Sequence, residues 1–149
     1  MIAEIRIGEC DFDAGAETEA LARRCEGPGA VTTFVGYVRA EPGLTSLTLE
    51  HYPAMSEREM SRHVEEAARR WALLGVTVIH RVGRLNPGDR IVFVAVAAMH
   101  RREAFEACEF LMDYLKTRAP FWKREERDGA VVWVEALNRD FDAANRWRR

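Results

Sequence analysis

Four cations surround a single proline in the segment DYLKTRAPFWKRE, residues 113–125, of a chain whose formal net charge is −2 at pH 7. Lys116 and Arg118 precede the proline, and Lys123 and Arg124 follow it. A turn at the proline could fold the second pair back toward the first. Two ammonium groups in a partly dry pocket lower each other's pKa, so that one becomes a candidate general base or nucleophile. The alternative is that Lys116 only complements the dipole at the end of a helix.

A second basic group stands where an apolar strand meets a helix, in AAMHRREAF, residues 97–105. His100, Arg101 and Arg102 would occupy the start of this helix, where cations oppose the helix dipole. A bound anion would remove that conflict, and the free amide groups of a helix N-terminus commonly hold phosphate. Alternatively, the arginines point into water or pair with the glutamates that follow them.

Arg39 ends the predicted strand FVGYVR, where its guanidinium could hold a phosphate through two hydrogen bonds, although a surface arginine at a strand end is commonplace. The other histidines, His51, His63 and His80, lack the spacing of metal ligands and are expected to be structural. There is neither a glycine-rich phosphate loop nor a nucleophile-elbow serine, so nucleotide hydrolysis and serine esterase chemistry are poorly supported. No metal site is predicted.

Composition limits the class of protein. Of the 149 residues, 48% are hydrophobic and 31% are charged, so one globular domain over residues 1–149 is expected. The slight negative charge argues against binding nucleic acid through bulk electrostatics, but it leaves room for a local basic pocket.

The cellular compartment is predicted from two features. The N-terminus lacks the apolar segment of a signal peptide and no later run is long enough to span a membrane, so a cytoplasmic protein without membrane association is expected. Cys10, Cys25 and Cys108 are odd in number and far apart, so reduced and mostly buried thiols are expected rather than disulfides or a zinc site.

Hydrophobic periodicity predicts the elements that must position these residues. Helices are expected at residues 13–24, 53–74 and 101–118, the second ended by Gly75 and the third by Pro120. Residues 136–149, polar and arginine-rich, are expected to form a C-terminal tail. The run at 90–99 is apolar almost throughout, so both faces of that strand should be covered. The mixed order predicts an α+β domain with a mostly antiparallel sheet, whose strands fall at 2–7, 30–39, 46–52, 76–85, 90–99, 121–125 and 130–136.

On these residues the chain resembles the large, catalytic subunit of molybdopterin synthase. The combination of YLKTRAPFWKRE with an upstream HR is highly specific for that family. The resemblance covers nearly everything from residue 31 to 136, in the segments FVGYVR, LTLEHYPAM, VTVIHRVGRLNPGD, IVFVAVAAMHR, AFEACEFLMDYLKTRAPFWKRE and WVEA.

The resemblance implies a fold, partners and a reaction. The family's fold is an α/β hammerhead with an added antiparallel subdomain, and its members form homodimers. Each protomer also binds a small ubiquitin-like sulfur-carrier subunit, giving a heterotetramer. The Gly-Gly thiocarboxylate at the end of the small subunit donates sulfur, in two successive transfers, to a pterin phosphate, cyclic pyranopterin monophosphate. The product is molybdopterin, on the route to the molybdenum cofactor, and no metal is needed for this step.

The family's residue roles carry over to matching positions. Lys116 and Lys123 are the implied catalytic residues: Lys116 would polarise the thiocarboxylate and stabilise charge during acyl transfer, and Lys123 would assist proton transfer. Tyr37 stands where some members have lysine, so a charged contact there would be replaced by a phenol. The implied substrate-binding residues, of which the first three would hold the phosphate and pterin, are Arg39, His100, Arg101, Arg124, Glu125 and Tyr37.

Other functions of the same residues stay open. A non-catalytic module that binds a phosphate ligand would tolerate Lys116→Ala with a modest loss of affinity, whereas a synthase would lose turnover and keep most of its binding. A lysine Schiff-base enzyme lacks a recognisable scaffold here. RNA binding ranks last, because no stacking platform accompanies the basic residues.

Overall fold

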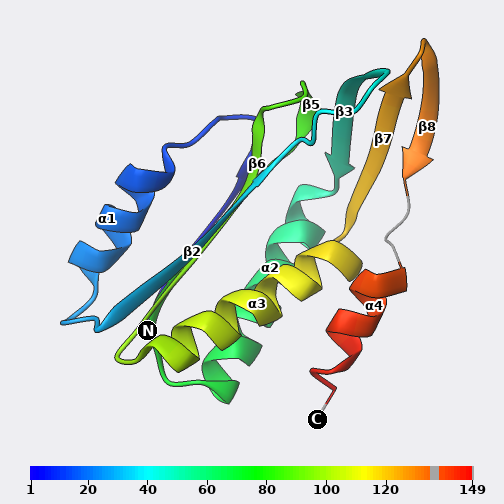
Figure 1. Cartoon of the computed structure of the whole chain (residues 1–149). Coiled ribbons are helices and arrows are strands. Elements are labelled where there is room, and N and C mark those ends of the chain that lie inside the picture. The colour runs from blue at the N-terminus through cyan, green and yellow to red at the C-terminus, as the bar shows by residue number, and fades with distance from the viewer. Residues whose placement is uncertain (135–137, 149) are drawn as a thin grey trace.

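Two four-stranded sheets lie side by side in the computed structural model, which describes residues 1–134 and 138–148 (Figure 1). The first sheet has the order β1-β4-β6-β2, with β1 parallel to β4 and the other neighbours antiparallel. Its strands are β1 (Ile2–Gly8), β2 (Ala30–Tyr37), β4 (Leu73–Arg81) and β6 (Arg90–Ala98). The second sheet is wholly antiparallel in the order β5-β3-β7-β8, formed by β3 (Leu44–His51), β5 (Gly83–Leu85), β7 (Phe121–Arg127) and β8 (Ala130–Val134).

Helices cover both faces of the first sheet. Helices α2 (Pro53–Arg70) and α3 (Arg101–Thr117) pack on one face, and α1 (Ala14–Arg24) packs on the other (Figure 1). Side chains of β6 belong to the hydrophobic cores on both faces of the first sheet, because successive side chains of a strand point to opposite faces. Val92, Val94 and Val96 face α2 and α3, whereas Phe93 and its alternate neighbours face α1. The predicted α+β class with mostly antiparallel pairing is confirmed, as is the expectation that β6 is covered on both faces.

The helix predicted at 53–74 is too long. Helix α2 ends at Arg70, and the next segment extends into β4 from Leu73. Gly75 does not end the helix: it lies in β4 against α1, where an added Cβ would be 2.7 Å from the Cys25 sulfur. Trp71 lies just beyond the end of α2 and packs against Phe110. Its position in the sequence continues the helical spacing of apolar residues, which is why the predicted helix was too long.

The single strand predicted at 76–85 is two strands in different sheets. Strand β4 ends at Arg81, and Gly83 begins β5 with a φ of 84°. This left-handed conformation favours glycine, and it directs the chain from the first sheet to the second. At the predicted hairpin, β8 ends at Val134, and residues 135 and 136 of the expected strand lie outside the described residues.

Part of the segment predicted as a tail is helical. Helix α4 spans Asn138–Asn145 and lies beside the end of α3 (Figure 1). Trp147 follows it and packs edge-on against Trp71 and Phe110. Its indole N–H donates to Asp113 of α3 over 2.6 Å. No helix among the described residues is long and apolar enough to cross a membrane.

Candidate functional site

A three-residue turn at the proline brings the end of α3 next to the start of β7. The amides of Arg118 and Ala119 both donate to the Tyr114 carbonyl, at 2.8 and 3.3 Å, which ends the helix. Strand β7 then starts at Phe121, whose amide donates to the Ala119 carbonyl over 2.8 Å. β7 runs antiparallel to β3, with Lys123 opposite Leu49.

Lys116 and Lys123 lie close together across this turn. Lys116 is exposed on the last turn of α3, and Lys123 is half-buried on β7. The pKa of Lys123 is lowered to about 8, mainly by burial and secondarily by the neighbouring charge of Lys116, while Asp140 and Glu125 act in the opposite direction. An ammonium group with such a pKa can exchange its proton near neutral pH, as a general acid or base must.

A buried histidine lies beside the two lysines. The imidazole of His80, on β4, is 5% exposed and stacks on Phe121 with 4.2 Å between ring centroids. Its Nδ1 lies 2.8 Å from the Arg81 carbonyl, to which it can donate when it carries the proton. The pKa of His80 is lowered to about 4, mainly by burial and to a smaller extent by the charges of Lys123 and Lys116. The ring is therefore neutral at physiological pH.

The sequence alone did not indicate that His80 belongs to this group. It was expected to be structural because the histidines of this chain lack the spacing of metal ligands. The strand lies in the first sheet and Lys123 in the second, so only the packing of the two sheets joins them. His51 of β3 also lies near Phe121, at 5.9 Å between ring centroids, and its Nδ1 is 3.1 Å from the Ser56 hydroxyl.

Arg124 and Glu125 take different directions from β7. Side chains alternate along a strand, so Arg124 points away from the face that Lys123 occupies. It pairs with Glu50 at 2.9 Å and lies 6.0 Å from the Trp133 ring. Glu125 shares the face of Lys123 and pairs with Arg127 at 2.9 Å.

His100 and Arg101 lie at the opposite end of α3 from Lys116. Lys116 lies fifteen positions after Arg101 in the helix, which corresponds to about 22 Å along the axis. The His100 side chain makes no capping hydrogen bond, and Arg101 forms no ion pair with any described residue. Arg102 pairs with Glu106 at 3.1 Å, as the alternative interpretation of this segment expected. One chain therefore does not bring His100 and Arg101 to its own lysine pair.

Arg39 and Tyr37 are exposed at the end of β2, an edge strand of the first sheet. Tyr37 is 57% exposed at the end of β2, and the Arg39 guanidinium lies 3.7 Å from Glu41. Glu41 also pairs with Arg127, at the far end of β7 from Phe121. Of the predicted site residues, one chain thus brings together Lys116, Lys123 and Glu125 and leaves the others apart.

The cysteines do not contribute to this site. Cys25 and Cys108 are buried, Cys10 is exposed, and all three thiols are free. Burial raises the pKa of the Cys108 thiol to about 12, which makes it a poor nucleophile. Within residues 1–134 and 138–148, His, Cys, Asp and Glu side chains form no group of three or more that could hold a metal ion.

Comparison with known proteins identifies close relatives. Residues 7–118 match the family described as MoaE protein. The chain is 53% identical over 147 residues to the molybdopterin synthase catalytic subunit of Escherichia coli, covering 97% of each chain. It is 53% identical over 147 residues to that of Mesorhizobium japonicum, covering 97% of this chain and 92% of the relative. The solved MoaE protein from Burkholderia ambifaria superposes with a TM-score of 0.86 at 49% identity, covering 98% of both chains.

Proposed function

The chain belongs to the MoaE family, and we propose that it is the catalytic subunit of a molybdopterin synthase. It transfers sulfur from the thiocarboxylated C-terminus of a small ubiquitin-like subunit to cyclic pyranopterin monophosphate, in the cytoplasm. The observation that carries this proposal is the pair formed by Lys116 and Lys123, where a half-buried ammonium group with a lowered pKa lies beside an exposed one. Both reactants are anionic, so a site that unites them must be cationic.

The two lysines have different parts in the reaction. Lys116, exposed at the end of α3, attracts the thiocarboxylate. After the sulfur has bonded to the pterin, Lys116 stabilises the oxyanion that forms when water attacks the acyl carbon, and the acyl carbon–sulfur bond breaks to release the carrier's carboxylate. Lys123, half-buried with a pKa of about 8, holds or releases a proton at its Nζ atom as sulfur is transferred. The neutral imidazole of His80 adds no third positive charge beside them.

The remaining cations reach this site from a second copy of the chain. His100 and Arg101 are exposed and stand about 22 Å along α3 from Lys116, too far to touch the same small molecule in one chain. In a homodimer they face the lysine pair of the partner copy and hold the substrate's phosphate. The outer edge of β2, where Phe34 is 38% exposed, offers an apolar surface for that contact. With one small subunit on each copy the assembly is a heterotetramer.

Reconstitution tests the proposed function. The chain is mixed with a thiocarboxylated small subunit and cyclic pyranopterin monophosphate, and molybdopterin is assayed. We expect product with the wild-type chain, and a loss of about 100-fold or more in turnover for Lys116→Ala with the affinity for the pterin phosphate largely retained.

Two outcomes contradict the proposal. No product from active components would remove the synthase assignment. A Lys116→Ala variant that keeps its turnover would favour a module that only binds a phosphate ligand. Arg23→Gln on α1, an exposed charge on the other face of the first sheet, serves as the control and should leave turnover unchanged.

A further inference from the structure

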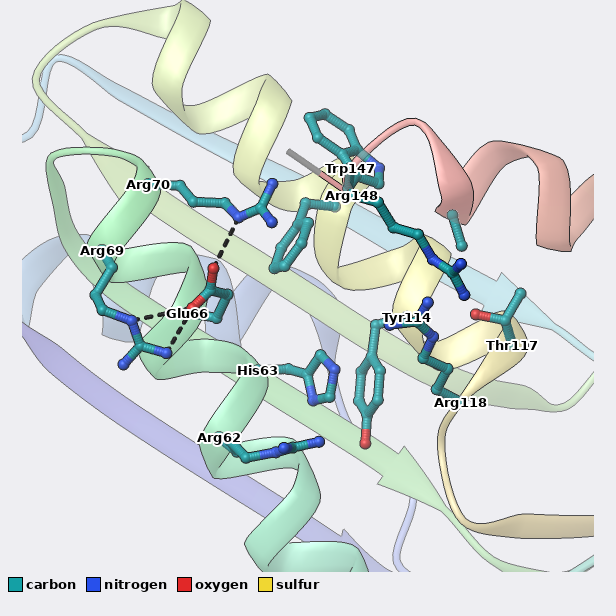
Figure 2. Close-up of a pocket in the computed structure, with 12 residues that line it drawn as sticks. Arg62, His63, Glu66, Arg69, Arg70, Tyr114, Thr117, Arg118, Trp147 and Arg148 are labelled. Atoms are coloured by element: carbon teal, nitrogen blue, oxygen red, sulfur yellow. Dashed lines mark hydrogen bonds and ion pairs between the residues drawn. The ribbon is translucent and has the colours of Figure 1, made fainter.

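A second basic pocket lies between α2, α3 and the residues around α4. Figure 2 shows its lining side chains, and its volume is about 320 Å³. Five arginines line it, and neither Lys116 nor Lys123 does. Three of these arginines come from α2, one from the end of α3 and one from the segment after α4: Arg62, Arg69, Arg70, Arg118 and Arg148.

Positive charge in this pocket exceeds the negative charge that could balance it. Glu66 is the one carboxylate among the lining residues, and it is already shared by Arg69 and Arg70, at 2.5 and 3.0 Å. Arg62 pairs with Glu59 at 2.9 Å. Arg118 and Arg148 form no ion pair with any described residue, although the chain as a whole is slightly acidic.

Aromatic packing holds the pocket in shape. The Arg70 guanidinium lies 4.9 Å from the centroid of the Phe110 ring, and Phe110 packs edge-on against Trp147 at 5.7 Å. On the other side, Tyr114 stacks on His63 (Figure 2). Burial lowers the pKa of His63, so this ring adds no charge of its own near neutral pH. The cations are therefore arranged around a fixed apolar floor before any ligand arrives.

We propose that this pocket binds a small phosphorylated anion, through the guanidinium groups of Arg118 and Arg148 together with those of α2. A guanidinium presents a planar set of donors that matches phosphate oxygens in pairs. Several guanidinium groups in one pocket bind a multiply charged anion more tightly than they bind a singly charged carboxylate. The volume suits a small ligand rather than a folded partner. The site is separate from the lysine pair, and its occupation does not depend on the proposed sulfur transfer.

Calorimetric titration with inorganic pyrophosphate tests this proposal on the full-length chain. We expect saturable binding of one pyrophosphate per chain. Arg118→Gln/Arg148→Gln should weaken it about tenfold or more, because charge-assisted hydrogen bonds are lost. The matched control Arg23→Gln/Arg24→Gln removes the same charge from α1, on the opposite face of the first sheet, and should change the affinity less than about twofold.

Further variants separate this pocket from the lysine pair. Lys116→Ala/Lys123→Ala should keep the pyrophosphate affinity, and a loss as large as that of the double arginine variant would place the binding at the lysines and overturn the proposal. Absence of saturable binding by the wild type, or equal weakening by the α1 control, would also overturn it. If the double arginine variant fails to fold, Arg148→Gln alone, at an exposed position after α4, gives the same test with a smaller expected loss.

Discussion

The lowered pKa of Lys123 has two physical sources that can be separated. Burial is the larger one, and the charge of Lys116 is the second. Replacing Lys116 removes only the second source, so the pKa of Lys123 should rise from about 8 but stay below the 10.5 of a solvated lysine.

Lysine-selective NMR titration measures this change directly. We expect the Lys123 side-chain resonances of Lys116→Met to titrate at higher pH than those of the wild type. Lys116→Arg keeps the positive charge and should leave the titration near its original position. Identical titrations in the wild type and Lys116→Met would show that the two side chains are not electrostatically coupled.

His80 should make the stability of the fold depend on pH. Its folded pKa of about 4 lies below the 6.5 expected in the unfolded chain, so the unfolded state binds the proton more readily. The stability from a neutral His80 is therefore complete above about pH 6.5 and is lost as the pH falls toward about 4, by up to about 3 kcal/mol. Urea unfolding of the wild type and of His80→Gln, near pH 7 and near pH 4.5, measures the effect. An equal loss of stability in both proteins would exclude His80 as its source.

At the scale of elements, Gly75 determines how closely α1 packs on the first sheet. A Cβ at this position would lie 2.7 Å from the Cys25 sulfur and 2.9 Å from a methyl group of Leu21, a residue that is 1% exposed. Gly75→Ala should therefore lower the free energy of unfolding by about 1–3 kcal/mol, because the buried neighbours must move. Gly8→Ala is the matched control in β1, where an added Cβ meets nothing within 4 Å and the change should be within about 0.5 kcal/mol. Equal effects of the two substitutions in urea unfolding would contradict the packing argument.

At the scale of the whole molecule, Arg101 and Lys116 lie about 22 Å apart along α3, so a site that uses both must be shared between two copies of the chain, and this can be tested. If Lys116 of one copy works with Arg101 of the other, Lys116→Ala and Arg101→Ala should each abolish turnover alone. Mixing equal amounts under conditions of subunit exchange should restore about a quarter of the wild-type activity, because half of the dimers are mixed and each of those has one intact site. Reconstitution with the small subunit and the pterin phosphate supplies the measurement. If verified mixed dimers show no recovery of turnover, the proposal that the two copies share a site is wrong.

The elements differ in how far local sequence could predict them. Strand β6 was predictable because an unbroken apolar run requires cover on both faces, and the turn between α3 and β7 was predictable because proline excludes a continuing helix. The end of α2 was predicted wrongly because Trp71 and Leu74 extend the helical spacing of apolar residues although they pack from outside the helix. Helix α4 was missed because its polar sequence has few apolar residues, and its contacts with α3 come from distant parts of the chain.

The sequence by itself determined the α+β class, the basic residues around the proline and the resemblance to a known family, since these depend on local patterns of residue type. Only the tertiary structure decided that His80 lies beside the two lysines, that Arg124 points away from them, and that His100 and Arg101 stand at the far end of α3. The arginine pocket likewise needs three helical regions to meet. Such positions depend on how sheets and helices pack, and the spacing of residues along the chain does not give the distances between them in the folded structure.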